Sequence, residues 1–163
     1  MRIYVDADSC PREARDMLLR FSSRRGIRSV FVANRLIPGI EIPGIEKAHD
    51  EFALMELCPK GEGAADDRIV ALACPGDLAI TRDLPLAERL VEKGITVIDD
   101  RGRTFTRENI RERRSLRDFT VSLAHNGMET ERTRGYGKKE LNAFANSLDR
   151  ELSRLSKRTE NPQ

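Results

Sequence analysis

The sequence predicts an α/β fold in which helices cover both faces of a mainly parallel sheet, and three observations lead to this prediction. The 163 residues are 39% apolar and 34% charged, a balance that suits a single globular domain. Short apolar runs without polar alternation recur along residues 1–100, as in strands that are buried on both faces. Segments with helical spacing of apolar residues separate these runs, which is the order of a parallel sheet.

The individual elements follow from the same signals. Strands are expected at residues 2–6, 29–33, 52–57, 78–81 and 95–98. Helices are expected at residues 11–25, 64–73 and 86–93. Pro11 suits a first helical position, and Gly26 and Gly94 suit positions just after a helix. A loop rich in Pro and Gly, residues 38–44, separates the second strand from the third.

Two more helices, at residues 106–125 and 138–157, follow without further strands. We therefore expect one domain over residues 1–163, with a core of about residues 1–105 and a helical C-terminal extension of about residues 106–157. The link between the two helices, NGMETERTRGYG, is polar and contains glycine, so we expect it to be mobile.

Charge is distributed unevenly along the chain, although the net charge is only +2. Residues 101–163 hold 15 Lys and Arg against 9 Asp and Glu, whereas residues 1–100 hold 14 against 18. This asymmetry fits a metal-binding body with an anion-binding arm, and equally a pair of solvated charged helices. No apolar run approaches the roughly 20 residues of a membrane span, and no signal peptide is recognisable, so we expect a cytoplasmic protein.

The three cysteines are widely spaced and form no CxxC pair, which argues against a disulfide framework. Cys10 lies just before Pro11, at the expected start of a helix. The helix dipole there would lower the pKa of a thiol and make it reactive. The alternative, which we favour, is a small residue that packs beneath the turn between strand and helix.

Carboxylates follow three of the expected strands and begin one helix. They are Asp6, Asp8, Asp66, Asp83, Asp99 and Asp100. Ligands gather at the carboxyl ends of parallel strands, so these acids are expected to converge. Three or four carboxylate oxygens suit Mg²⁺ or Mn²⁺, whose waters are available for hydrolysis. The structural alternatives are a turn at Asp99–Asp100 and a helix-dipole role for Asp66.

The segment IYVDADSC supports two enzyme hypotheses. In a phosphatase of the haloacid dehalogenase type, Asp6 would be the nucleophile and Asp8 the acid or base, but Cys10 stands where that family carries Thr or Val. In a metal-dependent nuclease, the acids hold only the metal and water is the nucleophile.

A set of motifs along almost the whole chain favours the second hypothesis. They are YVDADSCP, VAN (32–34), AADDRIV (64–70), GDLAITRDLPLA (76–87), KGITVID (93–99), RGRTFTRENI (101–110), RDF (117–119) and AFANSLDREL (143–152). In this order they resemble the YaiI/YqxD family of uncharacterised bacterial proteins, which is related to PIN-like and NYN nuclease domains. The resemblance implies a PIN-like three-layer α/β/α sandwich with an acidic pocket at the strand ends.

The resemblance also implies roles for single residues. Asp6, Asp66 and Asp83 match the metal-binding acids, and Asp8 is a further ligand or a base that orients water. Asn34 is expected to orient a water or a phosphate, and Thr81 to support the loop that carries Asp83.

The chain departs from the family pattern at two positions. Gly63 stands where relatives often carry an acid, so the pocket has one carboxylate fewer. Arg82 stands where small or polar residues are usual, and we expect it to neutralise charge or to reach phosphate.

The helix expected at 106–125 carries arginines at helical spacing. Arg107, Arg111 and Arg114 share one face, and guanidinium groups match phosphate, so Arg111 and Arg114 are candidates for contact with a nucleic-acid backbone. The alternative is that they pair with acids of the same helix, namely Glu108, Glu112 and Asp118.

The leading functional hypothesis is a Mg²⁺- or Mn²⁺-dependent phosphodiesterase that acts on nucleic acid, with RNA as the expected substrate. A non-catalytic module that binds nucleic acid or protein is the alternative from another class, and the phosphatase that uses Asp6 is the second enzyme hypothesis.

Overall fold

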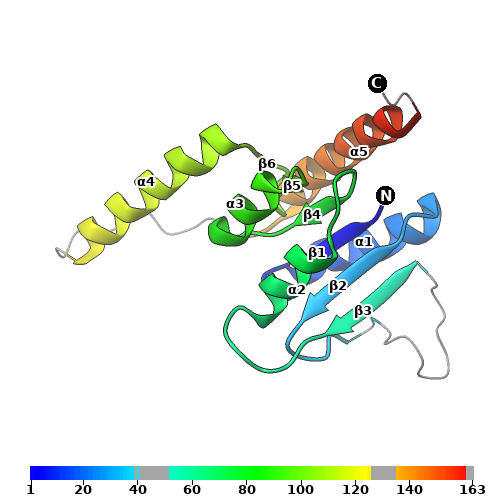
Figure 1. Cartoon of the computed structure of the whole chain (residues 1–163), viewed down its shortest axis with the longest axis horizontal. Coiled ribbons are helices and arrows are strands. Elements are labelled where there is room, and N and C mark those ends of the chain that lie inside the picture. The colour runs from blue at the N-terminus through cyan, green and yellow to red at the C-terminus, as the bar shows by residue number, and fades with distance from the viewer. Residues whose placement is uncertain (39, 41–51, 126–134, 161–163) are drawn as a thin grey trace.

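The computed structural model describes the backbone of residues 1–38, 40, 52–125 and 135–160 (Figure 1). It describes the side chains of the same residues except 117–125 and 158–160. Most of the loop expected at 38–44 and of the link expected at 126–137 therefore lies outside the described residues, as does the side chain of Asp118.

The described residues form an alternating series of strands and helices. The strands are β1 (Ile3–Asp6), β2 (Ser29–Ala33), β3 (Ala53–Leu57), β4 (Leu78–Ile80), β5 (Thr96–Ile98) and β6 (Thr104–Phe105). The helices are α1 (Arg12–Arg25), α2 (Ala64–Leu72), α3 (Leu84–Glu92), α4 (Arg107–His125) and α5 (Lys138–Glu160). All the elements expected from the sequence are present with small shifts of their ends, and β6 is the strand that the sequence analysis did not predict.

The sheet has the order β3-β2-β1-β4-β5-β6, and its first five strands run parallel. β6 is antiparallel to β5. The prediction of an α/β fold with a mainly parallel sheet is thus confirmed. The chain winds from β1 toward β3 in one direction and from β4 toward β6 in the other, so the order reverses between β1 and β4. Open α/β sheets bind their ligands at such a reversal, beyond the carboxyl ends of the strands.

Apolar side chains alternate between the two faces of the sheet, which explains why the strands are apolar throughout. On one face, Ile3 and Val5 of β1 pack against α1 and α5. On the other face, Tyr4 packs in a second cluster with side chains of α2 and α3. Helices therefore cover both faces, and each face has its own core.

Helix α5 is part of the first of these cores, whereas the sequence predicts a helical C-terminal extension outside the core at this point. Phe144, Leu148, Leu152 and Leu155 form an apolar stripe at helical spacing, and all four are buried in the cluster with β1 and α1. The core expected over about residues 1–105 must therefore be extended to α5. By contrast, Figure 1 shows α4 running away from the sheet beyond α3. Among the described residues, none of the helices is both long enough and apolar enough to cross a membrane.

Candidate functional site

Asp6 lies at the carboxyl end of β1, beside the reversal of strand order, and is only 6% exposed. Its Oδ2 atom accepts hydrogen bonds from the hydroxyl of Ser9 at 2.6 Å and from the hydroxyl of Thr81 at 2.8 Å. Two hydroxyl donors fix the orientation of this carboxyl group. The other oxygen, Oδ1, has no hydrogen-bond partner among the described residues.

Asp83 lies at the start of α3 and is linked to Asp6 through one side chain. The Oδ1 atom of Asp83 caps α3 by accepting a hydrogen bond from the backbone N–H of Leu86 at 2.8 Å. The backbone N–H of Asp83 donates to the Thr81 hydroxyl at 2.9 Å, and the same hydroxyl donates to Asp6. Thr81 is therefore the bridge that holds the two acids in a fixed relation.

Asp66 lies in the first turn of α2 and is half-buried. Burial is the largest cause that raises its pKa, to about 6, and the charges of Asp6 and Asp83 raise it further. The charge of Arg89 acts in the opposite direction. Asp66, Asp6 and Asp83 thus form one electrostatic cluster, which we call the acid cluster. The next residue, Asp67, is exposed and pairs with Arg89 at 2.7 Å.

The acid cluster offers carboxylate oxygens, the type of donor that a divalent cation such as Mg²⁺ binds. Within the described part of the chain, no three His, Cys, Asp or Glu side chains lie close enough to hold a metal ion together. Mg²⁺ usually keeps several waters and takes only one or two carboxylates as direct ligands. Asp6 and Asp83 each keep one oxygen without a partner among the described residues, and Asp66 keeps both. The donor set therefore fits a hydrated Mg²⁺ or Mn²⁺ ion.

Asp8 is not engaged with the acid cluster. Its Oδ1 atom accepts from the Nε of Arg35 at 3.0 Å, and its Oδ2 atom accepts from the backbone N–H of Asn34 at 3.1 Å. The Asn34 side chain is exposed, and its described hydrogen bond is made by the backbone. The structure thus brings Asp8 and Asn34 together with Arg35, whereas the sequence analysis placed them beside the metal-binding acids.

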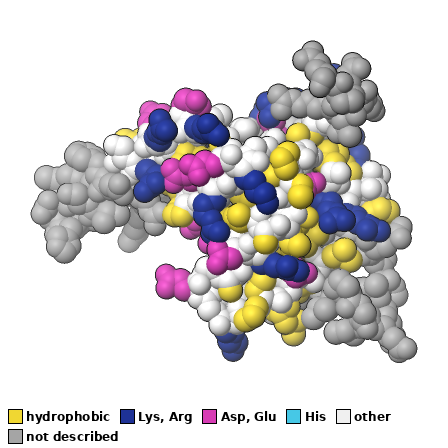
Figure 2. Space-filling model, viewed as in Figure 1, with side chains coloured by type: hydrophobic (Ala, Val, Ile, Leu, Met, Phe, Trp, Pro, Cys, Tyr) yellow, Lys and Arg dark blue, Asp and Glu magenta, His cyan; other side chains and the backbone are white. Residues whose placement is uncertain are grey.

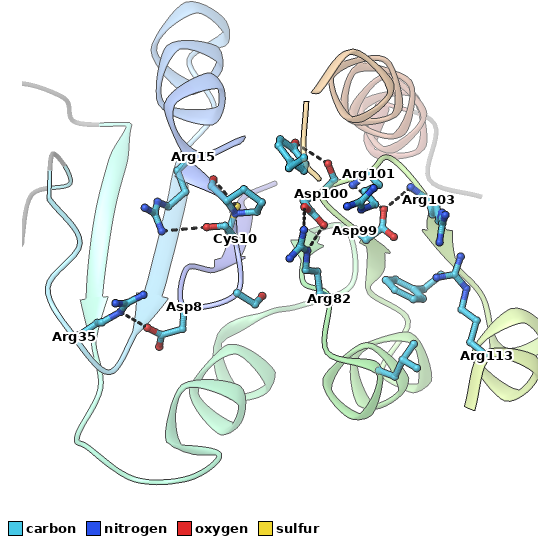
Figure 3. A pocket seen from close by; sticks show the side chains of 15 residues that line it. Asp8, Cys10, Arg15, Arg35, Arg82, Asp99, Asp100, Arg101, Arg103 and Arg113 are labelled. Carbon is cyan, nitrogen blue, oxygen red and sulfur yellow. Dashed lines mark hydrogen bonds and ion pairs between the residues drawn. The ribbon is translucent and has the colours of Figure 1, made fainter. Parts of the chain in front are cut away.

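A cavity of about 770 Å³ lies at the same edge of the sheet, and six arginines line it (Figure 3). We call this cavity the arginine pocket. Its arginines are Arg15, Arg35, Arg82, Arg101, Arg103 and Arg113. Three aspartates also line it, namely Asp8, Asp99 and Asp100. Figure 3 shows Arg15 and Cys10 on one side of the pocket and Arg101 and Arg103 on the other. Of these arginines, only Arg82 was predicted from the sequence as a substrate-binding candidate.

The two aspartates after β5 have structural roles. Asp100 is 2% exposed, and Arg82 donates to both of its oxygens, from Nε at 2.6 Å and from Nη2 at 2.7 Å. This hydrogen bonding raises the pKa of Arg82. Asp99 accepts the backbone N–H groups of Arg101 and Arg103, at 2.9 and 2.8 Å, and so closes the turn that leads to β6. Burial raises the pKa of Asp99, and these two hydrogen bonds oppose the rise.

Cys10 is 6% exposed and belongs to the core beneath the first turn. Burial is the first cause that raises the pKa of its thiol, to about 12, and the charge of Asp100 raises it further. A thiol with this pKa is protonated near neutral pH, so the geometry favours the packing role over the reactive one.

The arginine stripe of α4 lies against α3. Arg114 donates to Glu88 at 2.6 Å, and Arg107 and Arg111 line a cavity of about 300 Å³ together with Glu88 and Glu92. Among the described side chains, which do not include that of Asp118, the partner of Arg114 is therefore an acid of α3. Figure 2 shows basic side chains interspersed with acidic ones on this side of the molecule.

Arg113 lies elsewhere on α4, and its guanidinium is 5.2 Å from the ring centroid of Phe105 in β6. It therefore reaches the arginine pocket, which the stripe does not line. Arg113 was not predicted as a site residue because only the position of β6 shows which face of α4 borders the pocket.

Comparisons with known proteins agree with the resemblance found in the sequence. The family described as "Uncharacterized BCR, YaiI/YqxD family" matches residues 4–154. A UPF0178 protein of Ectopseudomonas mendocina is 42% identical over 159 residues, which cover 96% of this chain and 100% of the relative. A UPF0178 protein of Myxococcus xanthus is 43% identical, over 96% of this chain and 97% of the relative.

A UPF0178 protein of Treponema pallidum is 43% identical over 155 residues, 95% of this chain and 83% of the relative. No solved structure matches the chain. The family match runs from β1, which ends at Asp6, into the core helix α5. The chain therefore belongs to the YaiI/YqxD family.

Proposed function

We propose that this chain is a divalent-metal-dependent phosphodiesterase that cleaves nucleic acid, with RNA as its substrate. One observation carries the proposal: the acid cluster, in which three carboxylates from three elements lie at the reversal of strand order. Asp6 and Asp83 are fixed there by Thr81, and Asp66 is close enough to both for their charges to raise its pKa.

The electrostatics of the cluster support a cation between the acids. Carboxylates that lie close together repel one another, and burial adds to this cost, unless a cation or a proton neutralises them. Asp6 and Asp83 are held by hydrogen bonds from hydroxyl and backbone N–H groups, so they cannot simply move apart. A bound Mg²⁺ or Mn²⁺ would polarise a phosphodiester and lower the pKa of a bound water. In this account one or two of the carboxylates of Asp6, Asp66 and Asp83 would bind the ion directly and the rest through its waters, and Ser9 and Thr81 keep Asp6 oriented.

A PIN-like sandwich is part of the same proposal. Two features support it: parallel strands in the order β3-β2-β1-β4-β5, and acids at the carboxyl ends of β1 and β4. A fold shared with nucleases does not by itself establish their chemistry, so the proposal rests on the acid cluster.

The contacts of Asp8 are our reason for proposing a nuclease and not a phosphatase. A phosphatase that uses Asp6 as nucleophile needs Asp8 as an acid or base beside it. Asp8 instead pairs with Arg35 and accepts the N–H of Asn34, and both of its oxygens are used. The phosphatase would also form a covalent phosphoaspartate at Asp6, which mass spectrometry after incubation with a phosphomonoester would detect.

A cleavage assay with a matched pair of variants tests the proposal. A uniformly labelled single-stranded RNA is incubated with the wild type, Asp66→Asn or Asp67→Asn, in Mn²⁺ and in EDTA. Both variants remove one negative charge from the same turn of α2, but Asp67 is exposed, pairs with Arg89, and has the smallest effect among the charges that act on the pKa of Asp66. We expect Mn²⁺-dependent cleavage by the wild type and Asp67→Asn, and a loss of about 100-fold in Asp66→Asn.

Equal cleavage by both variants, or cleavage in EDTA, would contradict the proposal. RNA binding without cleavage, unaffected by Asp6→Asn, would favour the non-catalytic binding module instead.

A further inference from the structure

The arginine pocket adjoins the acid cluster but is separate from it. Ser9 lines the pocket and donates a hydrogen bond to Asp6. Leu84, which follows Asp83 in the chain, also lines it. A molecule that occupies the pocket is therefore next to two of the three acids.

The charges in the pocket do not cancel. Six arginines and three aspartates line it, and one of these arginines, Arg101, pairs at 3.6 Å with Glu140, which lies outside the lining. Two of the aspartates are already paired, Asp100 with Arg82 and Asp8 with Arg35. The third, Asp99, accepts two backbone N–H groups and is itself buried. Each aspartate of the pocket thus already has its own partners, and several arginines remain available to bind a ligand.

Three of the arginines form no ion pair with a carboxylate among the described residues, namely Arg15, Arg103 and Arg113. Arg15 is held in place because its Nη1 donates to the carbonyls of Ala7 and Cys10, both at 3.1 Å. Arg113 is supported by the ring of Phe105. The Arg103 side chain is exposed beside the turn after β5. Positive charge that forms no ion pair with a carboxylate, on side chains of which two are held by other contacts, is the chemistry of an anion site.

The size and charge of the pocket select one class of anion. A volume of about 770 Å³ suits a ligand of nucleotide size. A terminal phosphate carries a charge of about −1.5 to −2 near neutral pH, and the next phosphodiester adds one more. Their sum, about −3, suits the three arginines that form no ion pair among the described residues, whereas one internal phosphodiester would leave most of that positive charge unmatched.

We propose that the arginine pocket binds the terminal phosphate of a nucleic-acid strand and so places a phosphodiester near the strand end at the acid cluster. The inference rests on the proposed function for its substrate. Phosphate binding by the pocket depends only on its arginines and requires no metal ion.

The test is a binding measurement in EDTA, where cleavage is absent. The probe is a short single-stranded RNA with fluorescein at one end and either a phosphate or a hydroxyl at the other, made for the 5′ end and for the 3′ end. Fluorescence anisotropy gives the affinity of each form. We expect the wild type to bind one phosphorylated form about tenfold more tightly than its hydroxyl form, and the two series show which end is recognised.

A double variant and its matched control locate the site. Arg103→Gln with Arg113→Gln removes two charges from the pocket, and we expect it to bind phosphate and hydroxyl forms alike. Arg20→Gln with Arg24→Gln removes the same charge from exposed positions of α1 that do not line the pocket, and we expect it to keep the preference. If the double variant does not fold, Arg103→Gln alone affects only an exposed side chain and is expected to lose part of the preference.

No preference for either phosphorylated form in the wild type, or a preference that survives in the pocket variant, would overturn the inference. Mn²⁺-dependent cleavage without an end preference would overturn it and leave the proposed function in place. An end preference in a protein that cleaves no RNA would support the pocket and contradict the nuclease.

Discussion

Replacing Asp66 with Asn should stabilise the metal-free protein near neutral pH, which is unusual for a change at a half-buried polar residue. The pKa of Asp66 is raised from 3.8 to about 6, first by burial and then by Asp6 and Asp83. A carboxyl group whose pKa is higher in the folded state than in the unfolded state lowers stability above its folded pKa. This cost disappears as the pH falls below the unfolded value. Asn cannot ionise, so the folded variant does not lose this stability at neutral pH.

The magnitude follows from the size of the pKa change and from the exposure of the side chain. A rise from 3.8 to about 6 corresponds to about 3 kcal/mol for a fully shielded group. Asp66 is only half-buried, so solvent screening reduces this figure substantially. Asp66 also lies in the first turn of α2, where a negative charge gains about 0.3–1 kcal/mol from the helix dipole. The expected net gain is therefore about 1 kcal/mol.

Urea unfolding followed by circular dichroism measures this gain. It is carried out in EDTA at about pH 7.5, above the folded pKa, and at about pH 4, near the unfolded one. The control Asp67→Asn removes an exposed ion pair with Arg89 and should change stability by less than about 0.5 kcal/mol. The reasoning is refuted if Asp66→Asn is less stable than the wild type near neutral pH, or if its gain is the same at both pH values.

Three further changes test the packing around the site, each by the free energy of unfolding in urea. Arg82→Met leaves the buried Asp100 without its bidentate partner and should cost about 2–3 kcal/mol, and a neutral effect would contradict the ion pair. Phe144→Ala should cost about 3–5 kcal/mol because it opens a cavity in the core, and a loss below about 1 kcal/mol would place α5 outside that core. Gly102→Ala should cost at least about 2 kcal/mol, since φ is 79° and a Cβ there would lie 2.3 Å from the carbonyl oxygen of Ala143. An unchanged stability would show that the turn after β5 is not packed against α5.

The fold was largely predictable because its strands are buried on both faces. Such strands are continuous apolar runs, and Pro and Gly mark their ends, so β1 to β5 were found. β6 has only two residues, Thr104 and Phe105, and a periodic pattern cannot be recognised in so short a strand. Its pairing depends on the turn that Asp99 closes, which is a tertiary feature of the chain.

The position of α5 could not be deduced from local pattern. Its apolar stripe, which includes Phe144 and Leu148, is visible in the sequence and indicates a buried face. What that face packs against depends on the path of the chain after α4. The structure places it on the same side of the sheet as α1.

The acid cluster was predictable in part, because acids that follow parallel strands converge at one edge of the sheet. Asp6 and Asp83 meet this rule, and the resemblance to a family added Asp66. Asp8 follows the same strand as Asp6, but its contacts with Arg35 and Asn34 lie beyond what strand ends can indicate.

The arginine pocket was missed because its arginines come from separate segments. Helical spacing drew attention to the stripe of α4, which lies against α3. The available signal was the position of Arg82, Arg101 and Arg103 shortly after strands β4 and β5, where ligands bind in this class of sheet.

The most direct test of the central claim is a calorimetric titration of Mn²⁺ into the wild type, Asp66→Asn and Asp67→Asn. The account predicts one binding site in the wild type, an unchanged affinity in Asp67→Asn, and a loss of about 10-fold to 100-fold in Asp66→Asn. Equal Mn²⁺ affinity in all three proteins, or no binding by the wild type at millimolar Mn²⁺, would contradict the claim that the acid cluster holds a divalent metal ion.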